Sequence, residues 1–96
     1  MKKKKVSTTV VINNRSGLHA RPASVFAKEA NKYKSDIKII SNKNKKEANA
    51  KSIIDILSLT ATRGQSLELV AEGEDAEEAV KNIQSLVEKG LKNENL

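Results

Sequence analysis

The spacing of apolar residues changes repeatedly between a strand pattern and a helix pattern along this chain, and the order of these changes restricts the fold more than any single motif does. Strand-like spacing covers residues 6–12, 36–40, 47–50 and 66–73, and helix-like spacing covers residues 20–33, 52–59 and 75–89. The sequence therefore predicts the order strand, helix, two strands, helix, strand, helix.

Residue type and alternation support the first and last strands. The segment 6–12, "VSTTVVI", consists almost entirely of β-branched residues, which favour extended backbone. In the segment 66–73, two sets of side chains alternate, as is typical of a strand with one buried face and one face in water. The two sets are Leu67, Leu69 and Ala71 against Glu68, Val70 and Glu72.

Apolar residues three and four positions apart predict the first and last helices. They are Ala23, Phe26, Ala27 and Ala30 in the first helix, and Ala76, Ala79, Val80, Ile83, Leu86 and Val87 in the last. Asp75 is predicted to cap the last helix, and Gly90 to end it. Ser52 is a good N-cap for the short helix, with Asp55 in its first turn.

The length of 96 residues allows one core but not two. Helices this short cannot all bury their apolar faces against one another, so we expect them to form a layer on one face of a mostly antiparallel sheet. The opposite face of the sheet is then open to water. The sequence predicts an α+β domain.

Missing residue types exclude several kinds of site. The chain has no cysteine and one histidine, which excludes thiolate metal sites, cysteine nucleophiles and sites with several imidazole ligands. We expect no metal and no cofactor. The basic N-terminal stretch lacks the long apolar core and the cleavage site of a secretory signal, so we expect a cytoplasmic protein without a membrane partner.

The net charge of +6 raises the question of a nucleic-acid partner. The lysines gather in two runs, residues 2–5 and 43–47, and such runs are usually solvated. Only Phe26 and Tyr33 are available to stack on bases. We therefore predict no nucleic-acid partner, and a small basic binding domain stays open as an alternative.

His19, the single histidine, stands directly before the helix predicted from Ala20. Backbone N–H groups at a helix N-terminus lack partners and carry partial positive charge, which favours a neutral imidazole and attracts anions. Arg21 adds a guanidinium that can pair with phosphate oxygens through two donors. These features suit a histidine that carries a phosphoryl group covalently. The alternative is an ordinary exposed side chain at a helix start.

The motif "GLHARPAS" at 17–24, combined with "NAKSIIDILSL" at 49–59, closely resembles the HPr family, the histidine-containing phosphocarriers of the phosphoenolpyruvate-dependent sugar phosphotransferase system (PTS). The resemblance covers residues 6–90, and it leaves 1–5 as a basic N-terminal tail and 91–96 as a C-terminal tail. It implies an open-faced β-sandwich, in which a sheet of four antiparallel strands carries three helices on one face.

The resemblance also implies the chemistry of His19. This residue would accept a phosphoryl group from phospho-enzyme I on its Nδ1 (pros) nitrogen and pass it to the IIA component of a sugar permease, while Arg21 supports the phosphate. Such a carrier acts stoichiometrically and is not an enzyme. A nitrogen-branch or other regulatory paralogue would use the same chemistry and stays open as an alternative.

Ser52 resembles the serine that an ATP-dependent kinase phosphorylates in some relatives. This resemblance adds a serine kinase, a phosphatase and a transcriptional regulator to the implied partners. The plain alternative is that Ser52 is only a helix cap. Asp55 stands where many relatives have glycine, and it brings a carboxylate close to Ser52.

A docking surface for these partners is also implied by the resemblance. Ile54 and Leu57 match positions of an apolar docking patch, and Ser16 and Gly17 lie beside the histidine in the sequence. The alternatives are core positions for Ile54 and Leu57, and a turn for Gly17. Because a carrier exposes one face to successive partners, we expect a monomer.

Overall fold

A computed structural model describes residues 4–91 and confirms the predicted order of strands and helices. The strands are β1 (Lys5–Val11), β2 (Asp36–Ser41), β3 (Glu47–Asn49) and β4 (Ser66–Glu72), and the helices are α1 (Ala20–Ala30), α2 (Ile53–Ser58) and α3 (Ala76–Glu88). The largest difference from the prediction is at the end of α1, which stops at Ala30 instead of near Tyr33. A turn closed by hydrogen bonds to the last carbonyl groups of the helix follows at once.

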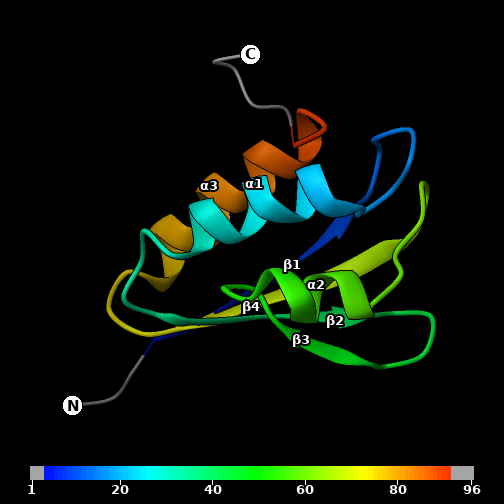
Figure 1. Cartoon of the computed structure of the whole chain (residues 1–96). Coiled ribbons are helices and arrows are strands. Elements are labelled where there is room, and N and C mark those ends of the chain that lie inside the picture. The colour runs from blue at the N-terminus through cyan, green and yellow to red at the C-terminus, as the bar shows by residue number, and fades with distance from the viewer. Residues whose placement is uncertain (1–3, 92–96) are drawn as a thin grey trace.

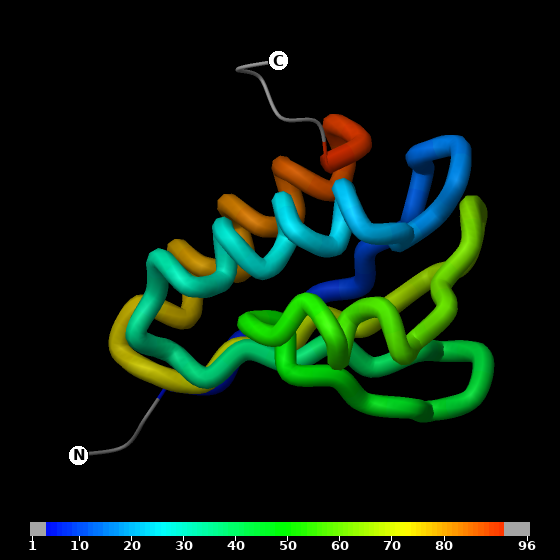
Figure 2. Tube along the Cα trace, viewed as in Figure 1, coloured from blue at the N-terminus to red at the C-terminus, as the bar shows by residue number. Residues whose placement is uncertain are grey.

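The four strands form one antiparallel sheet in the order β1-β4-β2-β3, so β4 pairs with both β1 and β2. The helices lie on one face of this sheet, with α1 and α3 side by side and α2 near the β3 edge (Figure 1; Figure 2). The predicted open-faced β-sandwich is confirmed. Its core lies between the sheet and the helices and is built around Phe26, which is completely buried.

The alternation predicted for β4 is confirmed on the core side and modified on the open side. Leu67, Leu69 and Ala71 are fully buried. Val70 belongs to the face that we expected to meet water, yet it is only 7 % exposed. Because β4 is an interior strand, its cross-strand neighbours Ser7 and Lys38 flank Val70 on both sides and shield it.

Asp75 stands directly before α3, as predicted, but its side chain does not cap that helix, so the prediction of a capping role is wrong. The carboxylate instead accepts hydrogen bonds from the backbone N–H of Lys34 at 2.9 Å and from the N–H and hydroxyl of Ser35 at 3.0 and 2.5 Å. Ser35 is 1 % exposed. Its donors have little access to water, so their need for an acceptor decides the orientation of Asp75.

Both ends of the described chain are packed against the domain. Lys4 forms an ion pair with Glu77 at 2.6 Å, and Lys5 already belongs to β1, one residue before the predicted start of the strand. Leu91, which we assigned to the C-terminal tail, is 2 % exposed, and its N–H donates to the carbonyl of Leu86. The other residues of the predicted tails, 1–3 and 92–96, lie outside the described residues. Within residues 4–91, no helix is long and apolar enough to cross a membrane.

Replacing Asp75 by Asn tests whether the hydrogen bonds from Ser35 to the ionised carboxylate stabilise the fold. Hydrogen bonds from the Ser35 hydroxyl and from the N–H groups of Lys34 and Ser35 hold the pKa of the Asp75 carboxyl below its ordinary value. A carboxyl with a lowered pKa in the folded state stabilises the fold above its unfolded pKa, about 4, and loses this effect as the pH falls through the folded pKa. We expect Asp75→Asn to lower the thermal midpoint at pH 7 and to lower it by a smaller amount at pH 2.5.

The measurement is thermal unfolding followed by circular dichroism between pH 2.5 and 7. Glu74→Gln is the matched control, because it removes the same charge from an exposed neighbour that makes no hydrogen bond within residues 4–91. A constant difference between Asp75→Asn and the wild type across this pH range would contradict the stabilising role of the ionised carboxylate.

Candidate functional site

His19 is the N-cap residue of α1, as the sequence predicted. Its backbone is extended, with φ −89° and ψ −169°, and its carbonyl accepts the hydrogen bond of Ala23 N–H at 2.9 Å, which closes the first turn. The imidazole is exposed and makes no capping hydrogen bond. The ring nitrogens therefore remain available to a reaction partner.

The first turn of α1 adds unpaired donors next to His19. Within the described residues, no group accepts a hydrogen bond from the backbone N–H of Ala20 or Arg21. Pro22 has no N–H to satisfy, and its buried ring fixes the start of the helix against the core. The Arg21 side chain is exposed. Two free N–H groups and a nearby guanidinium are suited to receive an anion.

The loop before His19 is held in place by backbone contacts. Leu18 is buried, and its N–H donates to the carbonyl of Ala61 at 2.9 Å. Gly17 has φ +71°, and a Cβ at this position would overlap the Ala61 carbonyl oxygen. Asn14 closes the turn, since its carbonyl accepts from Gly17 N–H at 3.0 Å and its amide donates to the Gly17 carbonyl at 2.7 Å. Gly17 is therefore a structural turn residue, while Ser16 is exposed.

Ser52 is the N-cap of α2, and its hydroxyl oxygen accepts a hydrogen bond from Asp55 N–H at 3.2 Å. The Asp55 carboxylate accepts from the backbone N–H of Asn49, also at 3.2 Å. The expected negative charge in the first turn of α2 is therefore present. The hydrogen bond between Asn49 and this carboxylate also closes the loop that leads into α2.

The structure places Ser52 and His19 at opposite ends of a helix pair. The helices α1 and α2 pack against each other and run in opposite directions (Figure 1). The Asn31 side chain, at the end of α1, donates to the carbonyl of Lys51 at 3.0 Å, directly before α2. Ser52 therefore lies near the end of α1 that is distant from His19, and the residues after α2 lie near the start of α1.

The apolar surface of α2 is larger than the sequence indicated. Ile54 is 79 % exposed, and Leu57 is partly buried against the core. Ile53 is also 42 % exposed, while Ile56 is fully buried. Ile56 is the only buried residue of this six-residue helix, and the side chains of its first turn are exposed. In the sequence, the feature that indicates this exposed apolar surface is the pair of adjacent isoleucines at the start of a short helix.

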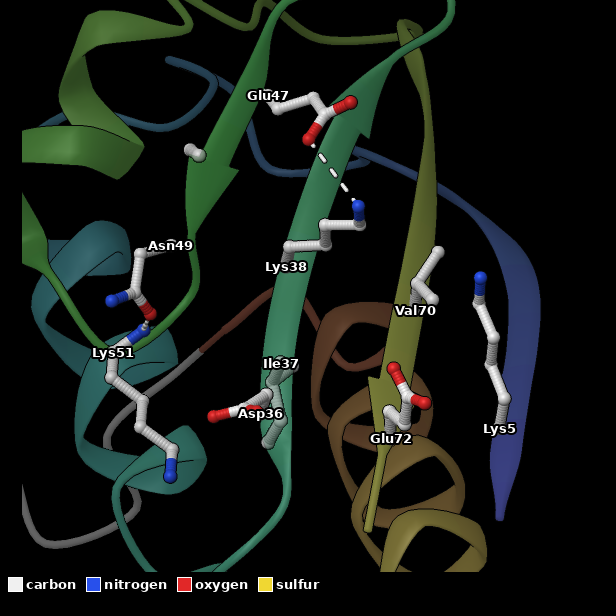
Figure 3. Close-up of a pocket in the computed structure, with 10 residues that line it drawn as sticks. Lys5, Asp36, Ile37, Lys38, Glu47, Asn49, Lys51, Val70 and Glu72 are labelled. Carbon is white, nitrogen blue, oxygen red and sulfur yellow. Dashed lines mark hydrogen bonds and ion pairs between the residues drawn. The ribbon is translucent and has the colours of Figure 1, made fainter. Parts of the chain in front are cut away.

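The described residues contain no cluster of side chains suited to bind a metal ion. No group of three or more His, Asp or Glu side chains within residues 4–91 is arranged to hold an ion. A groove of about 420 Å³ lies on the open face of the sheet, where Lys38 and Glu47 form an ion pair at 3.3 Å (Figure 3). The lining side chains come from all four strands and include Lys5 and Glu72. The groove lies on the side of the sheet away from α1 and His19.

Comparisons with known proteins agree with this geometry. Residues 6–89 match a family model described as the PTS HPr component phosphorylation site. The phosphocarrier protein HPr of Mycoplasma pneumoniae is 45% identical over 83% of this chain and 90% of its own length. The HPr-like protein Crh of Bacillus subtilis is 39% identical over 86% of this chain and 95% of its own. A crystal structure of HPr from Thermoanaerobacter tengcongensis superposes with a TM-score of 0.84 at 43% identity, covering 93% of this chain and 98% of that one.

The fold and these matches define a class, the phosphocarrier proteins of the PTS. Within that class, the chain belongs to the HPr family.

Gly17 and Gly64 form a matched pair for testing how the loop is positioned. Both have a positive φ, +71° and +90°, but a Cβ would collide with Ala61 and Thr62 at Gly17 and would meet open space at Gly64. We expect Gly17→Ala to lower the free energy of unfolding by about 2–4 kcal/mol, from steric overlap and backbone strain together. Gly64→Ala should cost about 1 kcal/mol, from strain alone. Urea unfolding measures both, and equal losses would contradict the close approach at Gly17.

Proposed function

We propose that this protein carries a phosphoryl group on His19 from phospho-enzyme I to the IIA component of a sugar permease. The observation that carries the proposal is an exposed imidazole, without a capping bond, at a helix N-terminus whose first two N–H groups are unpaired. Membership of a family of phosphocarriers supports it. The family resemblance also supplies the partners and the reactive nitrogen, Nδ1.

The transfer requires a neutral ring. The lone pair of Nδ1 attacks phosphorus, the P–N bond to the histidine of the donor breaks, and its electron pair returns to the donor ring. The ring of His19 is exposed and makes no capping hydrogen bond, so this lone pair is accessible to a donor protein. The phosphoryl oxygens are then stabilised by the N–H groups of Ala20 and Arg21 and by the Arg21 guanidinium.

This chemistry makes the protein a stoichiometric carrier and not an enzyme. His19 returns to its starting state only when a second protein removes the phosphoryl group. We propose that partners dock on a surface formed by Ser16, Ile54 and Leu57, and that the exposed Ile53 extends it. Gly17, which the family resemblance placed on this surface, is buried and shapes the turn beneath it. We also propose that the carrier works as a monomer, so that one surface serves successive partners. A nitrogen-branch IIA protein is the alternative acceptor, and it would use the same site.

The first test is incubation with enzyme I, phosphoenolpyruvate and Mg²⁺, followed by intact mass spectrometry. We expect one acid-labile phosphate on the wild type and none on His19→Ala. Arg21→Gln should retain the site but slow the transfer by about 10- to 100-fold, which corresponds to the loss of a charge-assisted hydrogen bond worth roughly 1.5–3 kcal/mol.

His19→Ala must first be shown to be folded by circular dichroism. An exposed side chain without a capping bond should leave the stability almost unchanged. A wild type that stays unphosphorylated, while the same enzyme I phosphorylates another acceptor, would overturn the proposed function.

We further propose that Ser52 is a regulatory phosphorylation site. Its hydroxyl is only half-buried at a helix start, and among the similar structures is that of Crh, which is described there as a catabolite repression HPr. A phosphate at this position would lie at the N-terminus of α2, in the same turn as the carboxylate of Asp55. Asp55 therefore opposes the modification through repulsion of like charges.

Incubation with an HPr-directed serine kinase and ATP tests this site. We expect an acid-stable phosphate on the wild type and none on Ser52→Ala, whose stability should fall by about 1 kcal/mol through loss of the cap. Asp55→Asn keeps an acceptor for Asn49 N–H but removes the charge, so it should raise the phosphorylation rate by about two- to fivefold. Equal rates for Asp55→Asn and the wild type would show that Asp55 does not oppose the kinase.

A further inference from the structure

The strand β1 forms one edge of the sheet and pairs only with β4. At its two ends, Gly73 N–H donates to the carbonyl of Lys4 at 2.8 Å, and Ile12 N–H donates to the carbonyl of Gln65 at 3.0 Å. The even-numbered residues of this segment therefore direct their backbone groups toward β4, and the odd-numbered residues direct theirs away from the sheet. Within residues 4–91, no group accepts a hydrogen bond from the N–H groups of these odd-numbered residues, which are Lys5, Ser7, Thr9 and Val11.

The two edges of the sheet differ in how far they are protected against pairing with another strand. At the opposite edge, β3 is only three residues long, and three lysines lie in the loop directly before it. The edge strand β1 is seven residues long, and residues 6–11 contain no charged residue and no proline. Short length, charge and proline are the features that keep an edge strand from accepting another strand. Of the two edges, β1 is therefore the one suited to strand addition.

A groove of about 660 Å³ lies between this edge and the helix α3. Val6, Ser7 and Thr8 line the groove on the strand side. On the helix side, the Gln84 amide donates to the Thr8 hydroxyl at 3.4 Å, which is a long hydrogen bond. Lys81, one turn earlier in α3, is exposed and forms no ion pair within residues 4–91. The groove therefore has two side-chain donors that a ligand can reach.

The acidic residues that line the groove lie nearer the start of α3. They are Glu77 and Glu78, and Glu77 already forms an ion pair with Lys4 at 2.6 Å. The region around Thr8 is adjacent to Lys81 and Gln84 instead. A carboxylate is the group that suits an ammonium and an amide donor together.

An extended peptide segment that lies antiparallel to β1 matches both the edge and the groove. Its backbone would exchange hydrogen bonds with Ser7 and Thr9, and its side chains would alternate between the groove and the open face of the sheet. The side chain opposite Thr8 points toward α3, because residues opposite each other in a sheet share a face. An acidic residue at that position would meet Lys81 and Gln84.

A second copy of this chain fits the edge less well than a different protein does. The strand β1 contains no Asp or Glu, so β1 of another copy would bring no carboxylate to Lys81. The net charge of +6 on each copy also opposes self-association, while it attracts an acidic segment. Charge therefore favours a partner protein.

We propose that the β1 edge binds an extended acidic segment of a partner protein by strand addition, with a carboxylate of that segment on Lys81. The helix α2, with its exposed isoleucines, lies near the β3 edge on the other side of the sheet (Figure 1). The segment therefore leaves the apolar surface of α2 free while it is bound. The inference is independent of the chemistry of His19.

The first test uses the peptide acetyl-Thr-Val-Glu-Val-Thr-Thr-amide, titrated into ¹⁵N-labelled protein and followed by NMR. With its Glu opposite Thr8, its second Val lies opposite Ser7. N-methylation of this Val removes an N–H that bonds to β1, whereas N-methylation of the Glu removes an N–H that points away from β1. We expect the first change to weaken binding by about 10-fold or more and the second by less than about twofold. Hydrogen exchange at Ser7 and Thr9 should slow by about 10-fold in the complex.

The second test uses variants of the protein. Lys81→Gln should weaken binding of the same peptide by about three- to tenfold at 50 mM salt, with a smaller difference at 500 mM. Lys28→Gln is the matched control, because it removes the same charge from an exposed position on α1 outside the groove. Thr9→Pro removes an outward N–H without breaking a bond to β4, and it should weaken binding by about 10-fold or more. Circular dichroism establishes that Thr9→Pro is folded, and the N-methylated peptides test the same point on the wild type.

Four results would overturn the inference. They are no chemical-shift change at up to about 5 mM peptide, equal weakening by the two N-methylated peptides, equal affinities of Lys81→Gln and Lys28→Gln, and a wild-type dimer in sedimentation that Thr9→Pro abolishes. The last result would assign the edge to a second copy of this chain. His19→Ala should bind the peptide as the wild type does, so a failure of the proposed phosphoryl transfer is distinguishable from a failure of this inference.

Discussion

The pairing of β4 with two neighbours at once is the constraint on which the rest of the structure depends. It places the buried residues of β4 in the interior of the sheet, facing the core, and it brings the loop before β4 beside the end of β1. Because Ala61 lies in that loop, its carbonyl can accept the N–H of Leu18 and so hold the chain just before His19. The position of the imidazole is therefore a consequence of sheet register.

The antiparallel packing of α1 and α2 places the two candidate sites at opposite ends of the helix pair. His19 lies at the start of α1, and the bond from Asn31 to Lys51 keeps Ser52 near the other end of that helix. A charge on Ser52 is therefore too distant for direct contact with the first turn of α1. Its effect on transfer would act through docking on the exposed isoleucines of α2, which lie beside it in the sequence.

Strongly periodic segments allowed most of the fold to be predicted, and local contacts explain where the prediction succeeded. The N-cap position of His19 and the capping side chain of Ser52 were predicted correctly because a helix start depends on residues only a few positions apart. Asp75 was predicted wrongly because its carboxylate binds Lys34 and Ser35, which lie far away in the sequence. The burial of Val70 was missed for the same reason, since it depends on neighbours in other strands.

The sequence by itself determined the order of elements, the absence of cysteine chemistry, and a lone histidine at a helix start with an arginine beside it. These features follow from periodicity and from residue type, which are local properties of a chain. Only the tertiary structure decided that Gly17 must pass against Ala61, and that the carbonyl of Ala61 holds Leu18 directly before His19. Contacts of this kind depend on strand order and register, and they arise because each strand must pair its backbone groups with a partner that is remote in the chain.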